Sequence, residues 1–252
     1  MSTPTVLIGG GTFVRGDDHH YPEEAPARHA TVDAFRLDVH QVTNAQFADF
    51  VADTGHVTMA ERHGGTVFVP ADAPVDLSQP QLWWRHEPSA SWRAPRGDGV
   101  AAAFDHPVVQ VTFADAAAYA AWAGGRLPTE IEWEWAAGAG VALPSRWPLA
   151  DDGMLLTNVW LGDFPWQSIR SRSPGTMPVG SFPPNPFGLF DMLGNVWEWT
   201  IDDVVKGGSF LCAANYCARY RPSARHVQPI DEPACHIGFR CAYSTGTATQ
   251  DG

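Results

Sequence analysis

The sequence is short of positive charge, with 16 Lys and Arg residues against 28 Asp and Glu residues and a formal net charge of -12 at pH 7. The average surface therefore repels a phosphate backbone, which argues against nucleic acid as a partner. Long apolar runs are also absent, because the most apolar segment, 108–124, is interrupted by Gln110, Thr112 and Asp115. No membrane span and no membrane partner are expected.

Targeting signals and cysteines are scarce as well. The first ten residues have neither a basic region nor an apolar stretch long enough for a signal peptide, which predicts a cytoplasmic protein. The four cysteines, Cys212, Cys217, Cys235 and Cys241, all lie in the last fifth of the chain. Because cytoplasmic thiols are kept reduced, these cysteines do not indicate a disulfide framework.

Glycine and proline, by contrast, are abundant. The 252 residues include 24 Gly and 21 Pro, and 44% of them are hydrophobic. This composition predicts one compact domain over residues 1–252 with a full core, two or three helices and much irregular chain. No internal repeat or linker is visible, the last few residues are expected to be disordered, and a monomer is expected.

Three helices are predicted from their starting residues. Thr43 with Gln46, and Thr129 with Glu132, have the spacing of a capping box, in which two polar side chains satisfy the first free N–H groups of a helix. A further helix is predicted over 112–122. The segment 55–105 has no periodicity and is expected to be irregular, packed on the body by its tryptophans.

Strands are expected where glycine turns bound short apolar pieces. The predicted strands are 8–16, 29–38, 188–190, 207–211 and 238–242.

The sharpest chemical feature is a pair of cysteines, Cys212 and Cys217, five positions apart. Neither a strand nor a helix brings two such sulfurs together, but a turn through 213–215 does. Two thiolates suit a soft ion such as Cu(I), whereas zinc normally takes four ligands. A short disulfide loop and two inert buried cysteines are the alternatives that the spacing leaves open.

Two arginines follow this pair. Arg219 and Arg221 would lower the pKa of a neighbouring thiol, or they would simply pair with acids such as Asp231 or Glu232. The motifs of zinc proteases, nucleotide-binding loops and serine hydrolases are absent, which argues against those classes.

A third feature is the segment 191–199, where Asp191 and Glu198 flank a glycine-bearing turn. Carboxylates and exposed carbonyls there suit a hard cation such as calcium. A capped turn anchored by Trp197 and Trp199 is the alternative.

Motifs along nearly the whole chain resemble the formylglycine-generating enzymes of the sulfatase-modifying factor family. The resemblance rests on residues 24–28, 42–44, 105–108, 122–130, 158–165, 194–199, 207–221 and 238–241. It implies an α+β, C-type-lectin-like fold with little regular secondary structure.

The resemblance also implies an activity. These enzymes use Cu(I) and O2 to convert a cysteine in a Cys-x-Pro-x-Arg peptide of an unfolded sulfatase segment into the aldehyde formylglycine. Two other functions remain open for this chain: oxidation of a different peptide or small-molecule thiol with Cu(I) and O2, and a non-catalytic lectin-like binding module.

Site residues follow from the matched motifs. Cys212 and Cys217 would be the copper ligands, and Ser209, Trp197 and Tyr216 would line the oxygen and substrate pocket. His236 stands where the family carries Asn, which would change the proton chemistry, since histidine titrates near neutral pH. Arg219 and Arg221 are assigned to the substrate side, and Gly65 stands where the family carries an acidic residue for the substrate arginine.

Calcium sites are implied in the same way. Asp191 and Glu198 by their side chains, and Gly194 and Val196 by their carbonyls, match a structural calcium site. A second site begins at Asn158 and Val159, but its acidic ligand falls at Ser171, so that site is expected to be lost. Ala120 stands opposite Cys241, which predicts a free thiol unless Cys241 meets Cys235.

Overall fold

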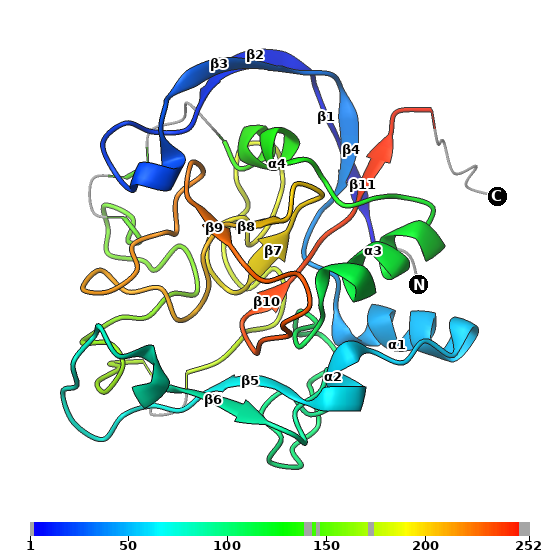
Figure 1. Cartoon of the computed structure of the whole chain (residues 1–252). Coiled ribbons are helices and arrows are strands. Elements are labelled where there is room, and N and C mark those ends of the chain that lie inside the picture. The colour runs from blue at the N-terminus through cyan, green and yellow to red at the C-terminus, as the bar shows by residue number, and fades with distance from the viewer. Residues whose placement is uncertain (1–2, 139–142, 145–146, 171–173, 247–252) are drawn as a thin grey trace.

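Short helices and strands joined by long irregular segments make up the protein (Figure 1). The computed structural model describes residues 3–138, 143–144, 147–170 and 174–246. The helices are α1 (Asn44–Thr54), α2 (Met59–His63), α3 (Phe113–Trp122) and α4 (Glu130–Ala136), with the 3-10 turns η1 (Pro22–Glu24) and η2 (Pro80–Leu82). This arrangement confirms the predicted α+β class with little regular structure.

Capping boxes start α1 and α4, as predicted. In α1 the Thr43 side chain accepts from the Gln46 N–H, and the Gln46 side chain accepts from the Thr43 N–H at 2.8 Å. In α4 the same exchange joins Thr129 and Glu132. The helix predicted over 112–122 is α3, and it too begins with a capping box. Local side-chain chemistry thus sets these helix starts.

Within the described residues, the strands form two sheets and two hairpins. They are β1 (Thr5–Ile8), β2 (Gly11–Arg15), β3 (Arg28–Val32), β4 (Phe35–Asp38), β5 (Gly65–Phe68), β6 (Trp84–Glu87), β7 (Trp197–Trp199), β8 (Val204–Lys206), β9 (Arg225–Val227), β10 (Ile237–Gly238) and β11 (Ala242–Ser244). One sheet has the order β1-β4-β11 and the other β10-β7-β8-β9, while β2 pairs with β3 and β5 with β6. Figure 1 shows the second sheet at the centre, with the β2–β3 hairpin arching over one end.

Several predicted strands are wrong or divided. Residues 185–188 form a turn, in which the Asn185 carbonyl accepts from the Gly188 N–H at 2.9 Å, and residues 189–190 have no regular structure. Residues 207–211 follow β8 as an irregular loop, because Gly207 and Gly208 both have positive φ. The strands predicted over 8–16 and 29–38 are each broken, and the one predicted over 238–242 runs from the end of β10 to the start of β11.

The segment 55–105 has more order than expected. It contains α2, which begins with a capping box between Thr58 and Glu61, and the β5–β6 hairpin. Trp83 and Trp92 are buried as expected, whereas Trp84 is half-buried. Periodicity missed these elements because each is only four or five residues long.

Three apolar clusters form the core. The largest packs α1 and α3 against the central sheet, and a second lies between α4 and the β1–β4 strands. The third is made largely of aromatic side chains and includes part of the loop that carries two of the cysteines, residues 207–221, called the cysteine loop below. Its buried members are Trp83, Trp160, Phe164, Phe210, Leu211 and Ala213.

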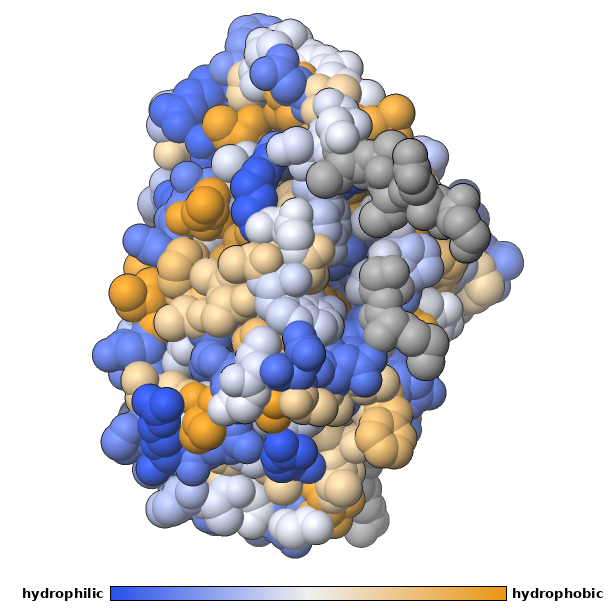
Figure 2. All heavy atoms as spheres, turned by 90° about the vertical axis from the view of Figure 1, so that its right-hand side faces the viewer, coloured by the Kyte–Doolittle hydropathy of each residue, from blue (hydrophilic) through white to orange (hydrophobic). Residues whose placement is uncertain are grey.

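The surface shows polar and apolar side chains interspersed on the face that lies at the right of Figure 1 (Figure 2). Among the described residues, no helix is both long enough and apolar enough to span a membrane.

Candidate active site

A turn brings the two predicted thiols together. The N–H groups of Tyr216 and Cys217 both donate to the Ala213 carbonyl, so the chain reverses between the cysteines. The Cys212 and Cys217 Sγ atoms lie 3.3 Å apart. This is longer than the S–S bond of a disulfide, about 2.05 Å, and all four cysteines are free. The predicted turn is therefore confirmed, and Cys241 is a free thiol that does not pair with Cys235.

Two glycines lead into this loop, where a side chain would not fit. A Cβ on Gly207 would lie 2.6 Å from the Met192 carbonyl oxygen, and Gly208 has a φ of +75°. After them, the Ser209 N–H donates to Cys212 Sγ at 3.4 Å. The donor is a backbone N–H, whose position is fixed by the fold of the loop. The contact therefore restrains the Cys212 sulfur next to Ser209.

The two thiols differ in acidity. The hydrogen bond from Cys212, together with the nearby Arg219 guanidinium, lowers the pKa of the Cys217 thiol below its ordinary value. Burial raises the pKa of Cys212 well above its ordinary value. The pair thus favours one thiolate, on Cys217, and one protonated thiol.

Alkylation measures this asymmetry in the metal-free protein. Iodoacetamide at pH 7 is expected to modify Cys217 first, since burial raises the pKa of Cys235 to about 11 and also raises that of Cys241. A thiolate fraction rises with pH and levels off above the pKa, and the pKa of Cys217 is lowered to about 6, so labelling of Cys217 should change little between pH 7 and pH 8. Peptide mass spectrometry at several pH values checks this. First labelling of another cysteine, or a steep rise over that range, would contradict it.

Both thiols open on a cavity of about 600 Å³. Four residues predicted for the site line it with them, namely Ser209, Trp197, Tyr216 and His236. Its walls also include residues that sequence reasoning missed, among them Thr66, Trp84, Phe164, His226, Gln228 and Glu232. No local motif marks these residues, because they come from β5, β6, β9 and separate loops.

Aromatic side chains build one wall. The Tyr216 and Phe164 rings stack at 4.6 Å with an interplanar angle of 4°, and Trp83 meets the Tyr216 ring edge-on at 5.4 Å. The Trp197 side chain is buried. This wall keeps the surroundings of the thiols apolar.

His236 lines the cavity. The expectation that it titrates near neutral pH is wrong. Burial lowers its pKa below the ordinary value, and its ring packs on Trp84 at 4.8 Å between centroids. Its Nδ1 atom is inaccessible and has no hydrogen-bond partner among the described residues. We conclude that His236 contributes a neutral imidazole to the wall.

The three residues assigned to substrate binding separate in the structure. Arg219 lines the cavity, with Nη1 3.8 Å from Cys217 Sγ. Arg221 does not line it, because its guanidinium is bound to Glu24. Gly65 also faces away: a Cβ there would lie 2.1 Å from the Gln110 side chain. The next residue of β5, Thr66, is the one on the cavity wall.

The partners of the arginines are glutamates from the start of the chain. The sequence pointed to Asp231 or Glu232, but Arg219 Nε donates to Glu23 at 3.0 Å and Arg221 Nη1 donates to Glu24 at 2.8 Å. The glutamates lie in η1, almost two hundred residues before the arginines. The spacing of residues along the sequence cannot predict a contact over such a separation.

The first calcium set is already supplied with donors. Glu198 accepts from Arg240 through both carboxylate oxygens, at 2.7 and 2.8 Å. The Gln41 amide nitrogen donates to the Asp191 carbonyl at 3.0 Å, to the Val196 carbonyl at 3.5 Å and to Glu198 at 3.0 Å. An N–H group thus contacts the Val196 and Glu198 oxygens of the predicted set, and the Asp191 side chain accepts from the Gly180 N–H at 2.6 Å. These three residues, as arranged, do not fit a cation. Calcium stays a prediction of the resemblance.

A positively charged side chain contacts the residues of the second predicted calcium site. Arg170 Nη1 donates to the Asn158 side-chain oxygen at 2.9 Å, and the Asn158 carbonyl accepts from the Asn195 N–H. Val159 is buried in the core. Ser171 lies outside the described residues, so the expected loss of this site stays a prediction.

The sulfur donors of the cysteine pair are chemically suited to Cu(I). Two thiols 3.3 Å apart, one favouring the thiolate, form a soft donor set. Among the described residues, no group of three or more His, Cys, Asp or Glu side chains is placed to hold a metal ion. A low-coordinate soft ion therefore suits the pair better than zinc, which asks for four ligands.

Known proteins resemble this chain over nearly its full length. A family model described as the sulfatase-modifying factor enzyme 1-like domain matches residues 1–245. The chain is 44% identical to a formylglycine-generating enzyme of Mycobacterium tuberculosis, over 96% of this chain and 98% of that protein. It is also 36% identical to the inactive C-alpha-formylglycine-generating enzyme 2 of Mus musculus, over 98% of this chain and 87% of that protein.

A solved structure has the same fold. The structure of PvdO from Pseudomonas aeruginosa has a TM-score of 0.69 and 22% sequence identity, and the match covers 95% of this chain and 94% of that chain. Together with the family model and the relatives, the fold is consistent with the predicted resemblance. The chain belongs to the sulfatase-modifying factor enzyme family.

Proposed function

We propose that this protein is a copper-dependent oxidoreductase that uses O2 to convert a peptidyl cysteine of a sulfatase-type Cys-x-Pro-x-Arg segment into formylglycine. One observation carries the proposal: the paired thiols of Cys212 and Cys217 open on a cavity large enough for a peptide side chain. The name of the Mycobacterium tuberculosis relative supports the reaction. The inactive relative at 36% identity means that family membership alone does not establish catalysis.

Cys212 and Cys217 would hold the metal. Bound Cu(I) would supply a redox-active, low-coordinate centre with room for O2 and the substrate thiol. Arg219 balances negative charge beside Cys217, and the Ser209 N–H does the same beside Cys212. The stacked rings of Tyr216 and Phe164 give the cavity an apolar wall next to the sulfurs.

The reaction needs an added reductant for its electrons to balance. The substrate carbon loses its bond to sulfur and one of its two bonds to hydrogen, and it gains a double bond to oxygen, which supplies two electrons. Reducing O2 fully takes four, and two added thiols that become a disulfide provide the others. The products are the aldehyde, hydrogen sulfide and water.

Peptide mass spectrometry tests the proposal. A Cys-x-Pro-x-Arg peptide is incubated aerobically with Cu(I)-loaded protein and a thiol reductant, and we expect a product that has lost one sulfur and two hydrogens and gained one oxygen. A peptide with serine for cysteine is the control and should be unchanged. Copper-loaded protein that converts other thiols but not this peptide would contradict the proposed substrate. Loaded protein that consumes no O2 with any thiol would contradict the activity.

A further inference from the structure

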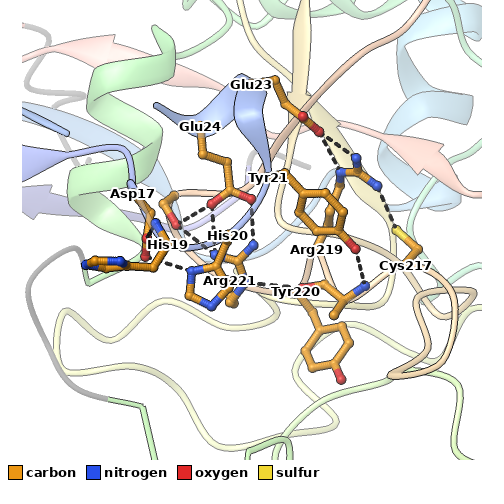
Figure 3. A network of polar contacts seen from close by, with 12 residues as sticks. Asp17, His19, His20, Tyr21, Glu23, Glu24, Cys217, Arg219, Tyr220 and Arg221 are labelled. Atoms are coloured by element: carbon orange, nitrogen blue, oxygen red, sulfur yellow. Dashed lines mark hydrogen bonds and ion pairs between the residues drawn. The ribbon is translucent and has the colours of Figure 1, made fainter. Parts of the chain in front are cut away.

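The start of the chain contacts the cysteine loop through one aromatic side chain (Figure 3). The Tyr21 ring lies against the Arg219 guanidinium, with the guanidinium carbon 3.7 Å from the ring centroid. The Tyr21 hydroxyl accepts from the Ala218 N–H at 3.2 Å. Tyr21 therefore holds the two residues that directly follow Cys217, one by its backbone and the other by its side chain.

Ion pairs fix the segment that carries Tyr21. Glu23 binds Arg219 on the edge of the guanidinium that its Nε and Nη2 form, and this leaves Nη1 directed at Cys217 Sγ, 3.8 Å away. Glu24 binds Arg221 and also accepts from Ser223. As Figure 3 shows, η1 is thus attached to the cysteine loop through two arginines, Arg219 and Arg221, next to the contact that Tyr21 makes.

The two cysteines are held by different means. Cys212 is fixed within its own region, by the Ser209 N–H on its sulfur and by the Trp160 N–H on its carbonyl at 3.0 Å. Cys217 is half-buried; its own N–H donates to the Ala213 carbonyl, and the residues directly after it are held by Tyr21 and Glu23. The local turn therefore brings the sulfurs together, and the contact from the other end of the chain adds a second restraint on Cys217 alone.

We propose that Tyr21 is a positioning residue that sets Cys217 against Cys212, acting through Arg219 and the Ala218 backbone. This proposal rests on the proposed function, because it takes the cysteine pair to be a copper site. The placement of the two sulfurs by Tyr21 does not itself depend on the metal.

Two ligands that need both sulfurs provide the test. The Cu(I) dissociation constant is measured by competition with a chromophoric chelator, and the affinity for phenylarsine oxide, which bridges two close thiols, is measured on the metal-free protein. Tyr21→Phe removes one hydrogen bond, and we expect both affinities to fall about fivefold. Tyr21→Leu also removes the ring, so a fall of about tenfold or more is expected.

Trp147→Phe is the matched control. The Trp147 indole N–H donates to the Tyr220 carbonyl at 2.9 Å, so this variant also removes one hydrogen bond to the backbone of the same loop, but away from Cys217. Its affinities should stay within about twofold of the unsubstituted protein. Circular dichroism melting of each variant separates a shifted sulfur from a destabilised fold.

The outcomes distinguish the two proposals. Unsubstituted protein that binds phenylarsine oxide but not Cu(I) would overturn the copper function, and the arsenical affinities of the variants would still decide the role of Tyr21. Tyr21→Leu protein with unchanged affinities, or with losses that Trp147→Phe reproduces, would overturn that role.

Discussion

Serine in place of Cys212 or Cys217 is expected to lower the rate of aldehyde formation by roughly a thousandfold or more. A hydroxyl is a hard, neutral donor and does not replace a thiolate on Cu(I). The change is nearly isosteric, so the loop should persist. Peptide mass spectrometry gives the rate, and chelator competition gives the lost Cu(I) affinity.

The other two cysteines supply the control for that experiment. Cys235 and Cys241 are buried and free, and neither lines the cavity that contains the thiol pair. Cys235→Ala is therefore expected to retain activity within about twofold, even where its stability falls. A Cys212→Ser protein that still forms aldehyde, or equal losses in Cys212→Ser and Cys235→Ala, would refute a specific role for the pair.

Loss of Arg240 is expected to have the largest effect on stability. Its side chain and that of Glu198 are both fully buried and joined by two hydrogen bonds. Arg240 also donates to the carbonyls of Asp38 and Phe190. Arg240→Ala leaves a buried carboxylate without its counter-charge, and the free energy of unfolding should fall by about 3–5 kcal/mol. Urea unfolding measures this.

An exposed ion pair gives the comparison. Arg85 and Glu87 are 3.4 Å apart, and the Arg85 side chain is 60% exposed. Solvent screens such a pair, so Arg85→Ala should cost less than about 1 kcal/mol. Similar losses in the two variants would show that the Glu198 carboxylate is compensated by its other donors, the Trp133 indole and the Gln41 amide.

Sequence reasoning succeeded where the determinants are local. The capping boxes at Thr43 and Thr129 predicted two helix starts because each involves only four neighbouring residues. Glycine misled the strand predictions: at Gly188 and Gly207 it permits a positive φ, and the same residue that bounds a strand elsewhere forms a turn here.

The candidate site divides in the same way. Cys212, Cys217 and Ser209 belong to one loop, and their closeness followed from a turn that could be predicted. Tyr21 and Glu23 reach the loop only through the tertiary fold, and nothing in their own surroundings in the sequence indicates it. Gly65 was assigned by resemblance alone, and the alternation of side chains along β5 places Thr66 in the cavity instead.

The contact between Glu23 and Arg219 joins residues 196 positions apart. On the ribosome, the beginning of the chain emerges long before its partner has been made. Tyr21 and Glu23 can therefore reach the residues that follow Cys217 only when synthesis is nearly complete. We therefore expect the proposed copper site to reach its final geometry at about the time the chain leaves the ribosome, even though the local turn between the cysteines can form earlier.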